Sequence, residues 1–121
     1  MNADVARALE QDRTIDITTT GRKTGRPHRK EIWFHNIDGR LFITGTPGRR
    51  DWHANLVAHP EFTFHLKQST RADLPARATP IVDNAQRREI IAKIHQKLEG
   101  DRDLEAWLAD SPLVEVELPA E

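Results

Sequence analysis

Apolar and polar residues alternate in several short stretches of this chain, a pattern typical of strands that bury one face. The clearest stretch is 61–67, where Phe62, Phe64 and Leu66 alternate with polar residues. Other stretches are rich in β-branched residues and end at turn-forming residues, which also favours strands. Strands are therefore predicted near residues 14–20, 28–35, 40–45, 61–68, 73–82 and 113–118.

Four other segments carry the signals of helices. The clearest is 84–98, in which Ile90, Ile91, Ile94 and Leu98 form one apolar stripe. Shorter helices are predicted for residues 2–11, 51–59 and 103–110. N-terminal caps are expected where a side chain can accept a backbone N–H, which is at Asn2, Asp51 and Asn84.

Turn residues connect the predicted strands mostly as antiparallel hairpins. Gly21 and Gly25 flank the first turn, and the Asp38-Gly39 pair forms the second. Pro75 and Pro80 place the strand at 73–82 at a sheet edge or a bulge. Six short strands with small helices favour a mainly β (α+β) fold, a compact antiparallel barrel, over a doubly wound sheet. The length of 121 residues predicts one domain, 1–121.

The composition removes several kinds of chemistry. The chain has no cysteine, which excludes a disulfide, a thiolate zinc site and a cysteine nucleophile. It also has no tyrosine, a common proton donor and stacking residue. No stretch approaches the roughly 20 apolar residues of a membrane span, and the N-terminus has no apolar run like that of a signal peptide. These features predict a cytoplasmic protein without a membrane span.

The positive charge of the chain is concentrated in one region. The whole chain has a net charge of −1, but residues 21–50 carry +6. Converging backbone amides of residues 22–25, beside Arg22 and Lys23, predict a site for phosphate or carboxylate. The alternative is a basic turn that is simply solvated. Binding of nucleic acid is not expected, because an RRM-type aromatic motif is missing and the rest of the chain is acidic.

The segment GTPGRRDW adds a second basic feature just before a predicted helix. The helix dipole favours anions there, but Asp51 as a cap would occupy the amides. Arg49 and Arg50 are therefore expected to act through their side chains. Trp52 and Asn55 share one face of this helix, where Trp52 favours a core position. A buried Asn55 needs polar partners, either in its own loop or on a ligand.

No catalytic or metal motif accompanies these features. The six histidines are scattered at spacings that fit no metal site, so none is expected. No Ser or Cys stands in a nucleophile motif, and no acidic pair has a recognisable spacing. An enzyme with this sequence would therefore take its reactive atom from a cofactor.

Five segments follow one another in an order found in a known family. They are TTTGRKTGRPH, EIWF, DGRLFI, RRDWHANLVAHPEF and ARATPIVDNAQRREI, within about residues 14–95. In these segments the chain resembles the deazaflavin-dependent nitroreductase family, flavin/deazaflavin oxidoreductases with a pyridoxamine-phosphate-oxidase-like split β-barrel. The resemblance implies a six-stranded split barrel. It also implies an 8-hydroxy-5-deazaflavin coenzyme (F-420), which carries a phosphodiester and a tail of glutamates.

The resemblance also implies which residues bind this coenzyme. In relatives, the positions of Arg22, Lys23 and His28 hold the anionic part, and many relatives have Arg in place of His28. The residues around Thr44 to Pro47 would lie along the ring system, bordered by Trp52 and Asn55. The expected cofactor-binding set is Arg22, Lys23, Thr24, Gly25, His28, Trp33, Thr44, Thr46, Arg49, Arg50, Trp52 and Asn55.

The implied reaction is hydride transfer from the reduced coenzyme to an electron-poor small molecule, such as a quinone, an activated alkene or a nitro compound. Trp33 or Trp52, with aliphatic residues, is expected to line the acceptor pocket. No side chain is assigned as proton donor, because solvent could supply the proton. Two alternatives stay open: an FMN-dependent reductase of the same fold, and a non-catalytic carrier of a cofactor, haem or bilin. Split barrels often dimerise, so a homodimer is a further hypothesis by analogy.

Overall fold

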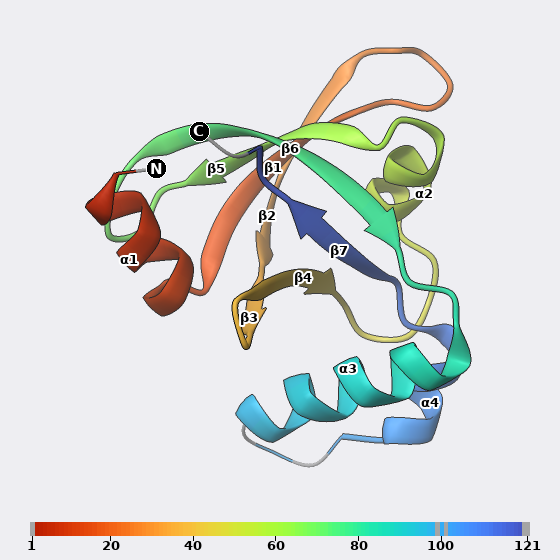
Figure 1. The fold of residues 1–121 in the computed structure, drawn as a ribbon. Helices are drawn as coiled ribbons and strands as arrows, with labels where there is room; N and C mark the ends of the chain where they lie inside the picture. Colours follow the sequence, from red (N-terminus) through yellow and green to blue (C-terminus); the bar gives the residue numbers. More distant parts are fainter. Residues whose placement is uncertain (1, 99, 101, 120–121) are drawn as a thin grey trace.

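A computed structural model describes residues 2–98, 100 and 102–119 of the chain. It contains a sheet and four helices (Figure 1). In chain order they are α1 (Ala3–Gln11), β1 (Thr14–Thr20), β2 (Pro27–Trp33), β3 (His35–Ile37), β4 (Arg40–Thr44), α2 (Asp51–Ala58), β5 (Glu61–Leu66), β6 (Ala72–Pro80), α3 (Asn84–Lys97), α4 (Leu104–Asp110) and β7 (Leu113–Glu117). The predicted strands and helices thus all occur, with bounds shifted by a few residues.

All strand pairs in the sheet are antiparallel, in the order β2-β1-β5-β6-β7-β4-β3. The prediction of six strands is wrong, because the expected strand at 28–35 breaks at Phe34 into β2 and β3. The first piece pairs with β1 and the second with β4. The two edge strands are therefore consecutive in the chain. The sheet forms a curled, seven-stranded half-barrel rather than a six-stranded closed barrel (Figure 1).

Two hydrophobic clusters lie on opposite faces of the curled sheet. The larger one fills the inside of the curl and includes Ile17, Phe64 and Val114, with Leu9 from α1 and Leu56 from α2. The smaller one packs α3 and α4 against the outside of β3, β4 and β7. Strand β4 serves both clusters, since Leu41 and Ile43 face the first and Phe42 the second. Alternation along one strand thus covers both of its faces with apolar contacts.

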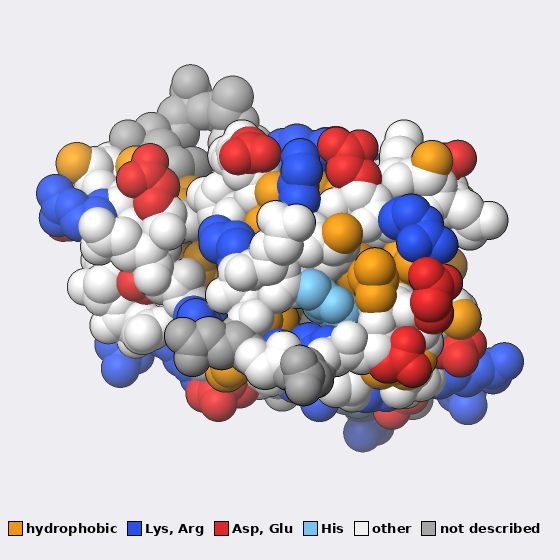
Figure 2. All heavy atoms as spheres, turned by 90° about the horizontal axis from the view of Figure 1, so that it is seen from below, with side chains coloured by type: hydrophobic (Ala, Val, Ile, Leu, Met, Phe, Trp, Pro, Cys, Tyr) orange, Lys and Arg blue, Asp and Glu red, His pale blue; other side chains and the backbone are white. Residues whose placement is uncertain are grey.

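The α3–α4 pair covers one end of the molecule, below β4 in Figure 1. Figure 2 shows this end with basic and acidic side chains interspersed and apolar side chains between them. It carries no large patch of a single charge sign. The positive excess of residues 21–50 therefore does not gather on the face shown there.

Two of the three predicted helix caps are wrong by one residue. Asn2 caps α1, since its Oδ1 accepts the N–H of Val5 at 2.8 Å. Helix α3 is capped by Asp83 instead of Asn84, and Asp83 accepts the N–H of Gln86 at 2.9 Å. Two adjacent residues that can both cap are not separated by sequence spacing alone.

The N-cap of α2 also differs from the predicted one, and this bears on anion binding at the start of the helix. Arg50 is the N-cap and makes no capping hydrogen bond with its side chain, while Asp51 already lies inside the helix. The expected competition by an Asp51 cap is therefore absent at the start of α2, next to Arg49 and Arg50. Asp51 remains in the first turn, where its negative charge interacts favourably with the helix dipole and stabilises α2.

Strand β6 lies inside the sheet and pairs with an unbroken register, so the expected position at an edge or a bulge is wrong. It pairs with β5 through Ala72–Arg77 and with β7 through Arg77–Pro80. Pro75 therefore has a partner strand only in β5, and Pro80 only in β7. Each proline lacks the N–H that a second neighbour would need, and each stands where that neighbour is missing.

None of the helices formed by the described residues is long and apolar enough to cross a membrane.

Candidate functional site

The turn between β1 and β2 is fixed by its own backbone. Gly21 N–H donates to the carbonyl of Arg26 at 2.8 Å, and Gly25 N–H donates to the carbonyl of Gly21 at 2.9 Å. Gly25 has φ of 72°, a left-handed conformation that glycine adopts without strain. The Thr24 hydroxyl accepts the N–H of Arg26 at 3.2 Å. The turn is thus a rigid platform for the side chains on it.

The predicted cluster of four free amides in this turn is only half present. The N–H of Arg22 donates to the Asn55 side chain, and the N–H of Gly25 is used within the turn. Only Lys23 and Thr24 keep N–H groups without a hydrogen-bond partner in the described part of the chain. An anion held here must therefore bind chiefly to side chains.

Asn55 explains how α2 holds the turn. Its side chain is 4% exposed, and its Oδ1 accepts both the N–H and the Nη1 of Arg22, at 3.1 and 3.0 Å. Its Nδ2 donates to the Thr19 hydroxyl at 3.3 Å. The buried amide is thus satisfied by protein groups on both sides. Asn55 therefore positions Arg22 rather than offering a free amide to a ligand.

A cavity of about 430 Å³ lies between the turn, β1, β2 and α2, and we call it the hairpin cavity. Its lining residues are Ile17, Thr19, Gly21, Arg22, Lys23, Thr24, His28, Lys30, Asp51, Trp52 and Asn55. Three cationic side chains face one acidic side chain, Asp51, which pairs with Arg22 at 3.3 Å. The Asp51 side chain is almost fully exposed, so this pair neutralises little of the positive field.

The imidazole of His28 packs directly against the backbone of the turn. A Cβ atom added to Gly21 would lie 2.7 Å from Nε2 of His28 and 3.1 Å from Oγ1 of Thr24. Real Cβ atoms do not approach so closely, so the exposed His28 ring would have to move aside for any larger residue at position 21. Gly21 thereby lets the His28 ring form part of the wall of the hairpin cavity.

Strand alternation divides the basic stretch between two faces. His28 and Lys30 line the hairpin cavity, whereas Arg29 points to the other face and binds Asp16 at 2.9 Å. Arg26 is exposed and does not line the cavity. Of the five cations between residues 22 and 30, only three therefore face the candidate anion site.

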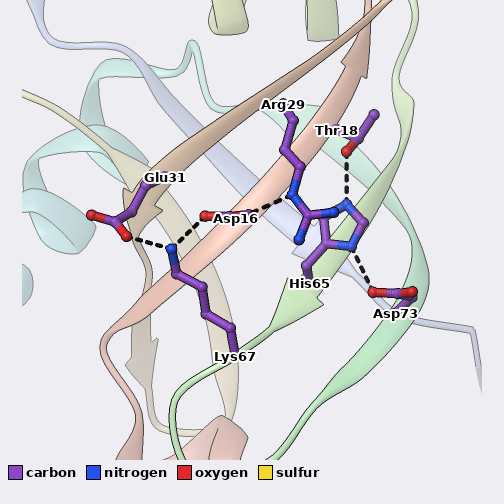
Figure 3. A network of polar contacts seen from close by, with 7 residues as sticks. All are labelled: Asp16, Thr18, Arg29, Glu31, His65, Lys67 and Asp73. Atoms are coloured by element: carbon purple, nitrogen blue, oxygen red, sulfur yellow. Dashed lines mark hydrogen bonds and ion pairs between the residues drawn. The ribbon is translucent and has the colours of Figure 1, made fainter.

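Figure 3 shows the network on the other face. Lys67 bonds to Asp16 at 2.6 Å and also to Glu31, while His65 lies between Thr18 and Asp73, at 2.7 Å from each. The hydrogen bond from Lys67, followed by that from Arg29, lowers the pKa of Asp16 against the opposing effect of burial. Arg29 and Glu31 are therefore engaged in ion pairs on the face of the sheet opposite the hairpin cavity.

Several predicted residues lie away from the hairpin cavity. Thr44 is buried and its hydroxyl donates to the carbonyl of Pro112 at 2.5 Å. Thr46 accepts from Arg50 through its hydroxyl at 2.6 Å. Trp33 ends β2, far from the turn, with 45% of its surface exposed and the Arg13 guanidinium 4.9 Å above its ring. Trp52 does line the cavity, but it is 5% exposed and belongs to the main core.

Arg49 and Arg50 instead line a second hollow, of about 540 Å³, which we call the interhelix cavity. It lies between the loop before α2, the first turn of α2, the start of α3 and the end of α4. Its lining residues are Gly48, Arg49, Arg50, His53, Ile81, Val82, Asn84, Arg87, Leu108, Ala109, Asp110, Ser111 and Pro112.

A third hollow, the linking hollow, lies along α2. It shares Arg22 and Asp51 with the hairpin cavity, and Arg49, Arg50 and His53 with the interhelix cavity. The three hollows are therefore neighbours on the surface around the start of α2. Burial, and then the charge of Arg87, lower the pKa of His53, so its imidazole is neutral near pH 7.

The expected set left out five residues that line the hairpin cavity, namely Ile17, Thr19, Gly21, Lys30 and Asp51, and it also left out His53 of the interhelix cavity. Lys30 could have been found, since it stands two residues after His28 and so shares its face of β2. Ile17 and Thr19 follow by the same rule from the burial of β1. His53 had no such signal, because its neighbours in the cavity come from α3 and α4.

Comparison with known proteins decides between the cofactor classes left open by the sequence. The family model of the F420H(2)-dependent quinone reductases matches residues 1–114. The chain belongs to this family. It is therefore a deazaflavin-dependent oxidoreductase at the level of the family, as the resemblance in its sequence predicted. The expected deazaflavin coenzyme is confirmed at the same level.

Solved structures similar to this member of the quinone reductase family share its fold. A conserved hypothetical protein, Rv2991 from Mycobacterium tuberculosis, has a TM-score of 0.77 at 17% identity, over 99% of this chain and 81% of that one. A protein described as an F420 reductase has a TM-score of 0.65 at 19% identity, over 94% and 92%. A putative 5-nitroimidazole antibiotic resistance protein from Bacteroides thetaiotaomicron has a TM-score of 0.71 at 11% identity, over 98% and 81%.

The residues of the hairpin cavity suit the anionic part of the family's coenzyme. Arg22, Lys23 and Lys30 offer charged donors to a phosphodiester, and His28 offers a further ring nitrogen. Trp52 and Ile17 supply apolar surface beside them. Within the described residues, no group of three or more potential metal ligands is placed to hold an ion.

Proposed function

We propose that this chain binds a reduced deazaflavin with its phosphodiester and glutamate tail against the hairpin cavity, and passes hydride to a quinone-like acceptor. The single observation that supports this proposal most strongly is the pairing of Arg22 with Asn55, at 3.0 and 3.1 Å, at the mouth of a cation-lined cavity. A buried side chain holds a cation in place there. Such preorganisation lowers the entropy cost of binding an anion.

The cations of the cavity have separate tasks in this proposal. Arg22 is held by Asn55 and Asp51, so it offers a fixed guanidinium edge to the phosphodiester. Lys23 and Lys30 are exposed and can follow a flexible tail as mobile point charges. His28, packed on Gly21, closes the other side of the cavity.

When bound, the reduced deazaflavin supplies a hydride from its ring carbon C5. With one proton from solvent, this hydride reduces a quinone to its hydroquinone, so two electrons and two hydrogens are balanced. The chain's own task is to bind and orient, because among the described residues no acid–base pair stands in the hairpin cavity in a catalytic arrangement. Apolar residues such as Trp52 and Ile17 limit the access of water on one side.

The deciding experiment is a fluorescence or calorimetric titration of the oxidised deazaflavin coenzyme, a truncated deazaflavin without phosphate and glutamates, and FMN. The double substitution Arg22→Ala, Lys23→Ala should weaken binding of the intact coenzyme at least about tenfold, which corresponds to about 1.4 kcal/mol. Raising the salt should weaken the wild type more than the variant. The truncated compound should bind both proteins about equally.

Arg26→Ala is the matched control, since Arg26 is on the same turn but does not line the hairpin cavity. Turnover of reduced coenzyme with 2-methyl-1,4-naphthoquinone completes the test. Equal affinity of the double variant and the wild type for the intact coenzyme would remove the hairpin cavity from the binding site. Turnover with reduced FMN but not with reduced deazaflavin would overturn the proposed coenzyme for this chain.

A further inference from the structure

The interhelix cavity has partly apolar walls. Ile81 and Leu108 belong to the hydrophobic cluster under α3 and α4 and also line the cavity, together with Pro112. Val82 stands at its rim with 81% of its surface exposed, so an apolar ring entering the cavity would find apolar surface there. Its volume of about 540 Å³ is within the range of small-molecule sites.

Positive charge is present in the same cavity, and only part of it is structural. The Arg87 guanidinium donates to backbone carbonyls of Ile81, Trp107, Leu108 and Ser111 at 2.9 to 3.3 Å, which joins α3 to α4. Arg50 is likewise engaged by Thr46. These two arginines have little capacity left for a ligand.

Arg49 differs from both of them. Its side chain is exposed, lines the cavity and forms no hydrogen bond or ion pair with the residues that the structure describes. One acidic residue, Asp110, lines the same cavity, against three arginines. The cavity therefore has a positive excess, with Arg49 as the cation available to a ligand.

Two uncharged groups add hydrogen-bonding capacity. The Ser111 side chain is 4% exposed, and its Oγ is buried without a partner among the described residues. An unpaired buried hydroxyl is costly, typically about 1–3 kcal/mol. His53, neutral near pH 7, is half-buried on the other wall. Both can donate a hydrogen bond to an oxygen atom of a ligand.

We propose that the interhelix cavity binds the electron acceptor, and that it selects acceptors which join an apolar ring to a carboxylate. The ring packs against the apolar walls, and the Arg49 guanidinium donates hydrogen bonds to the carboxylate. This inference rests on the proposed function, because the linking hollow shares lining residues with both this cavity and the proposed coenzyme site. It narrows the quinones named by the family description to acceptors that carry a carboxylate.

The binding test uses the protein without coenzyme, so that failure of coenzyme binding does not affect it. Calorimetry compares 2-naphthoate with 2-naphthylmethanol, which has the same ring but no charge. The wild type should bind the carboxylate at least about fivefold more tightly, a difference of about 1 kcal/mol. Arg49→Gln should abolish this preference and leave the affinity for the alcohol unchanged.

Arg71→Gln is the control for the loss of one positive charge, because Arg71 is exposed and lines none of the three hollows. A second pair of variants acts at the rim. Val82→Asp should weaken 2-naphthoate more than Val82→Asn does, and both should fold because Val82 is exposed. Equal affinity of the wild type for the two compounds, or equal effects of the Arg49 and Arg71 substitutions, would overturn the proposed site.

A turnover experiment connects the cavity to the reaction. With reduced deazaflavin, 1,4-naphthoquinone-2-carboxylate is compared with 1,4-naphthoquinone. Arg49→Gln should raise KM for the carboxylate at least about fivefold and leave KM for the neutral quinone unchanged. An equal change for both quinones would refute the carboxylate selection. Absence of all turnover, with the naphthoate preference intact, would refute the proposed function and leave the binding site standing.

Discussion

Asn55 holds Arg22 through a single oxygen atom that accepts the backbone N–H at 3.1 Å and the guanidinium at 3.0 Å. The contact joins residues 33 positions apart, on α2 and on the turn after β1. It couples the packing of a helix to the placement of a cation. Since the amide is buried and the guanidinium borders a cavity, the core of the protein determines where the positive charge stands.

Substitution of Asn55 should therefore affect both stability and coenzyme binding. Asn55→Ala leaves the buried Thr19 hydroxyl and the Arg22 backbone without their partners, which should lower the free energy of unfolding by about 2–3 kcal/mol. The released guanidinium should weaken binding of the deazaflavin coenzyme about fivefold, or by about 1 kcal/mol. Urea unfolding and fluorescence titration measure the two effects.

Thr19→Val is the matched control, because it removes the hydrogen bond from Asn55 Nδ2 but leaves both bonds to Arg22. It should lower stability while changing coenzyme affinity less than about twofold. If Thr19→Val weakens binding of the coenzyme as much as Asn55→Ala does, the loss of affinity is caused by a general loss of order in the site. The positioning role of Asn55 would then be wrong.

The contact between Gly21 and His28 gives a test that needs no ligand. Gly21→Ala places a methyl group where Nε2 of His28 lies, so the ring must move out. Because His28 is exposed, the free energy of unfolding should fall only by about 0.5–1 kcal/mol, which is the cost of forcing one side chain from its rotamer. In a His28→Ala background the same substitution should cost much less, because Oγ1 of Thr24 is then the nearest remaining side-chain atom.

A double-mutant cycle by urea unfolding measures this coupling, which should exceed about 0.5 kcal/mol. Additive effects of the two substitutions would show that the ring does not occupy the space above Gly21. Coenzyme titration of Gly21→Ala then reports what the displaced ring contributes to binding.

Much of the fold was predictable because short-range rules govern it. Alternation located the strands, and the two hairpin turns were recognised from Gly25 and from Asp38-Gly39, whose φ values are positive. The break at Phe34 was not predictable in this way. Both sides of residues 34–37 are used, since Phe34 enters the main core and Ile37 the cluster under α3 and α4. Because residues of both clusters lie on one continuous stretch of the chain, the sequence pattern of this stretch resembles that of a single strand.

The candidate site was predictable in part, since six of the expected residues line the hairpin cavity: Arg22, Lys23, Thr24, His28, Trp52 and Asn55. Arg22, Lys23 and His28 were identified from the turn and the resemblance, and all three line the hairpin cavity. The sequence did not show that the N–H groups of Arg22 and Gly25 donate hydrogen bonds within the protein. The bond from Arg22 reaches Asn55 on α2, which is distant in sequence. The interhelix cavity was invisible for the same reason: four separate segments form it, and only tertiary packing brings them together.

Two tryptophans with opposite environments give a matched pair of substitutions. Trp52 is part of the main core, whereas Trp33 is half-exposed at the end of β2. Trp52→Ala should lower the free energy of unfolding by about 3–5 kcal/mol. Trp33→Ala should cost about 1 kcal/mol or less, chiefly through the lost contact with Arg13. Thermal and urea unfolding followed by circular dichroism compare the two variants.

The same pair bears on the acceptor pocket. Trp33 lines none of the three hollows, so Trp33→Ala should leave KM for 2-methyl-1,4-naphthoquinone unchanged. A large rise in KM for this variant would contradict the placement of the acceptor in the interhelix cavity. It would support the earlier expectation, from the sequence, of a pocket beside Trp33.

His35 makes the stability of the protein depend on pH. The side chain is 8% exposed on β3, and burial, followed by the charges of Lys97, Arg13 and Arg102, lowers its pKa from 6.5 to about 4. Between these two values the unfolded chain binds more protons than the native one. The free energy of unfolding should therefore fall as the pH drops from about 6.5 toward 4, by about 2 kcal/mol at pH 5, and His35 should contribute no slope above pH 7.

His35→Gln removes this titration, so its stability should change less between pH 7.5 and pH 5 than that of the wild type, whatever its stability at pH 7.5. Urea unfolding at both pH values measures the difference of slopes. His53 and His95, whose pKa values burial also lowers, remain in both proteins and cancel in the comparison. His59→Gln is the control for the substitution of one imidazole by an amide, because His59 is exposed at the end of α2. Equal slopes for His35→Gln and the wild type would show that His35 accepts a proton in the folded protein as readily as in the unfolded chain, and would contradict its burial as a neutral ring.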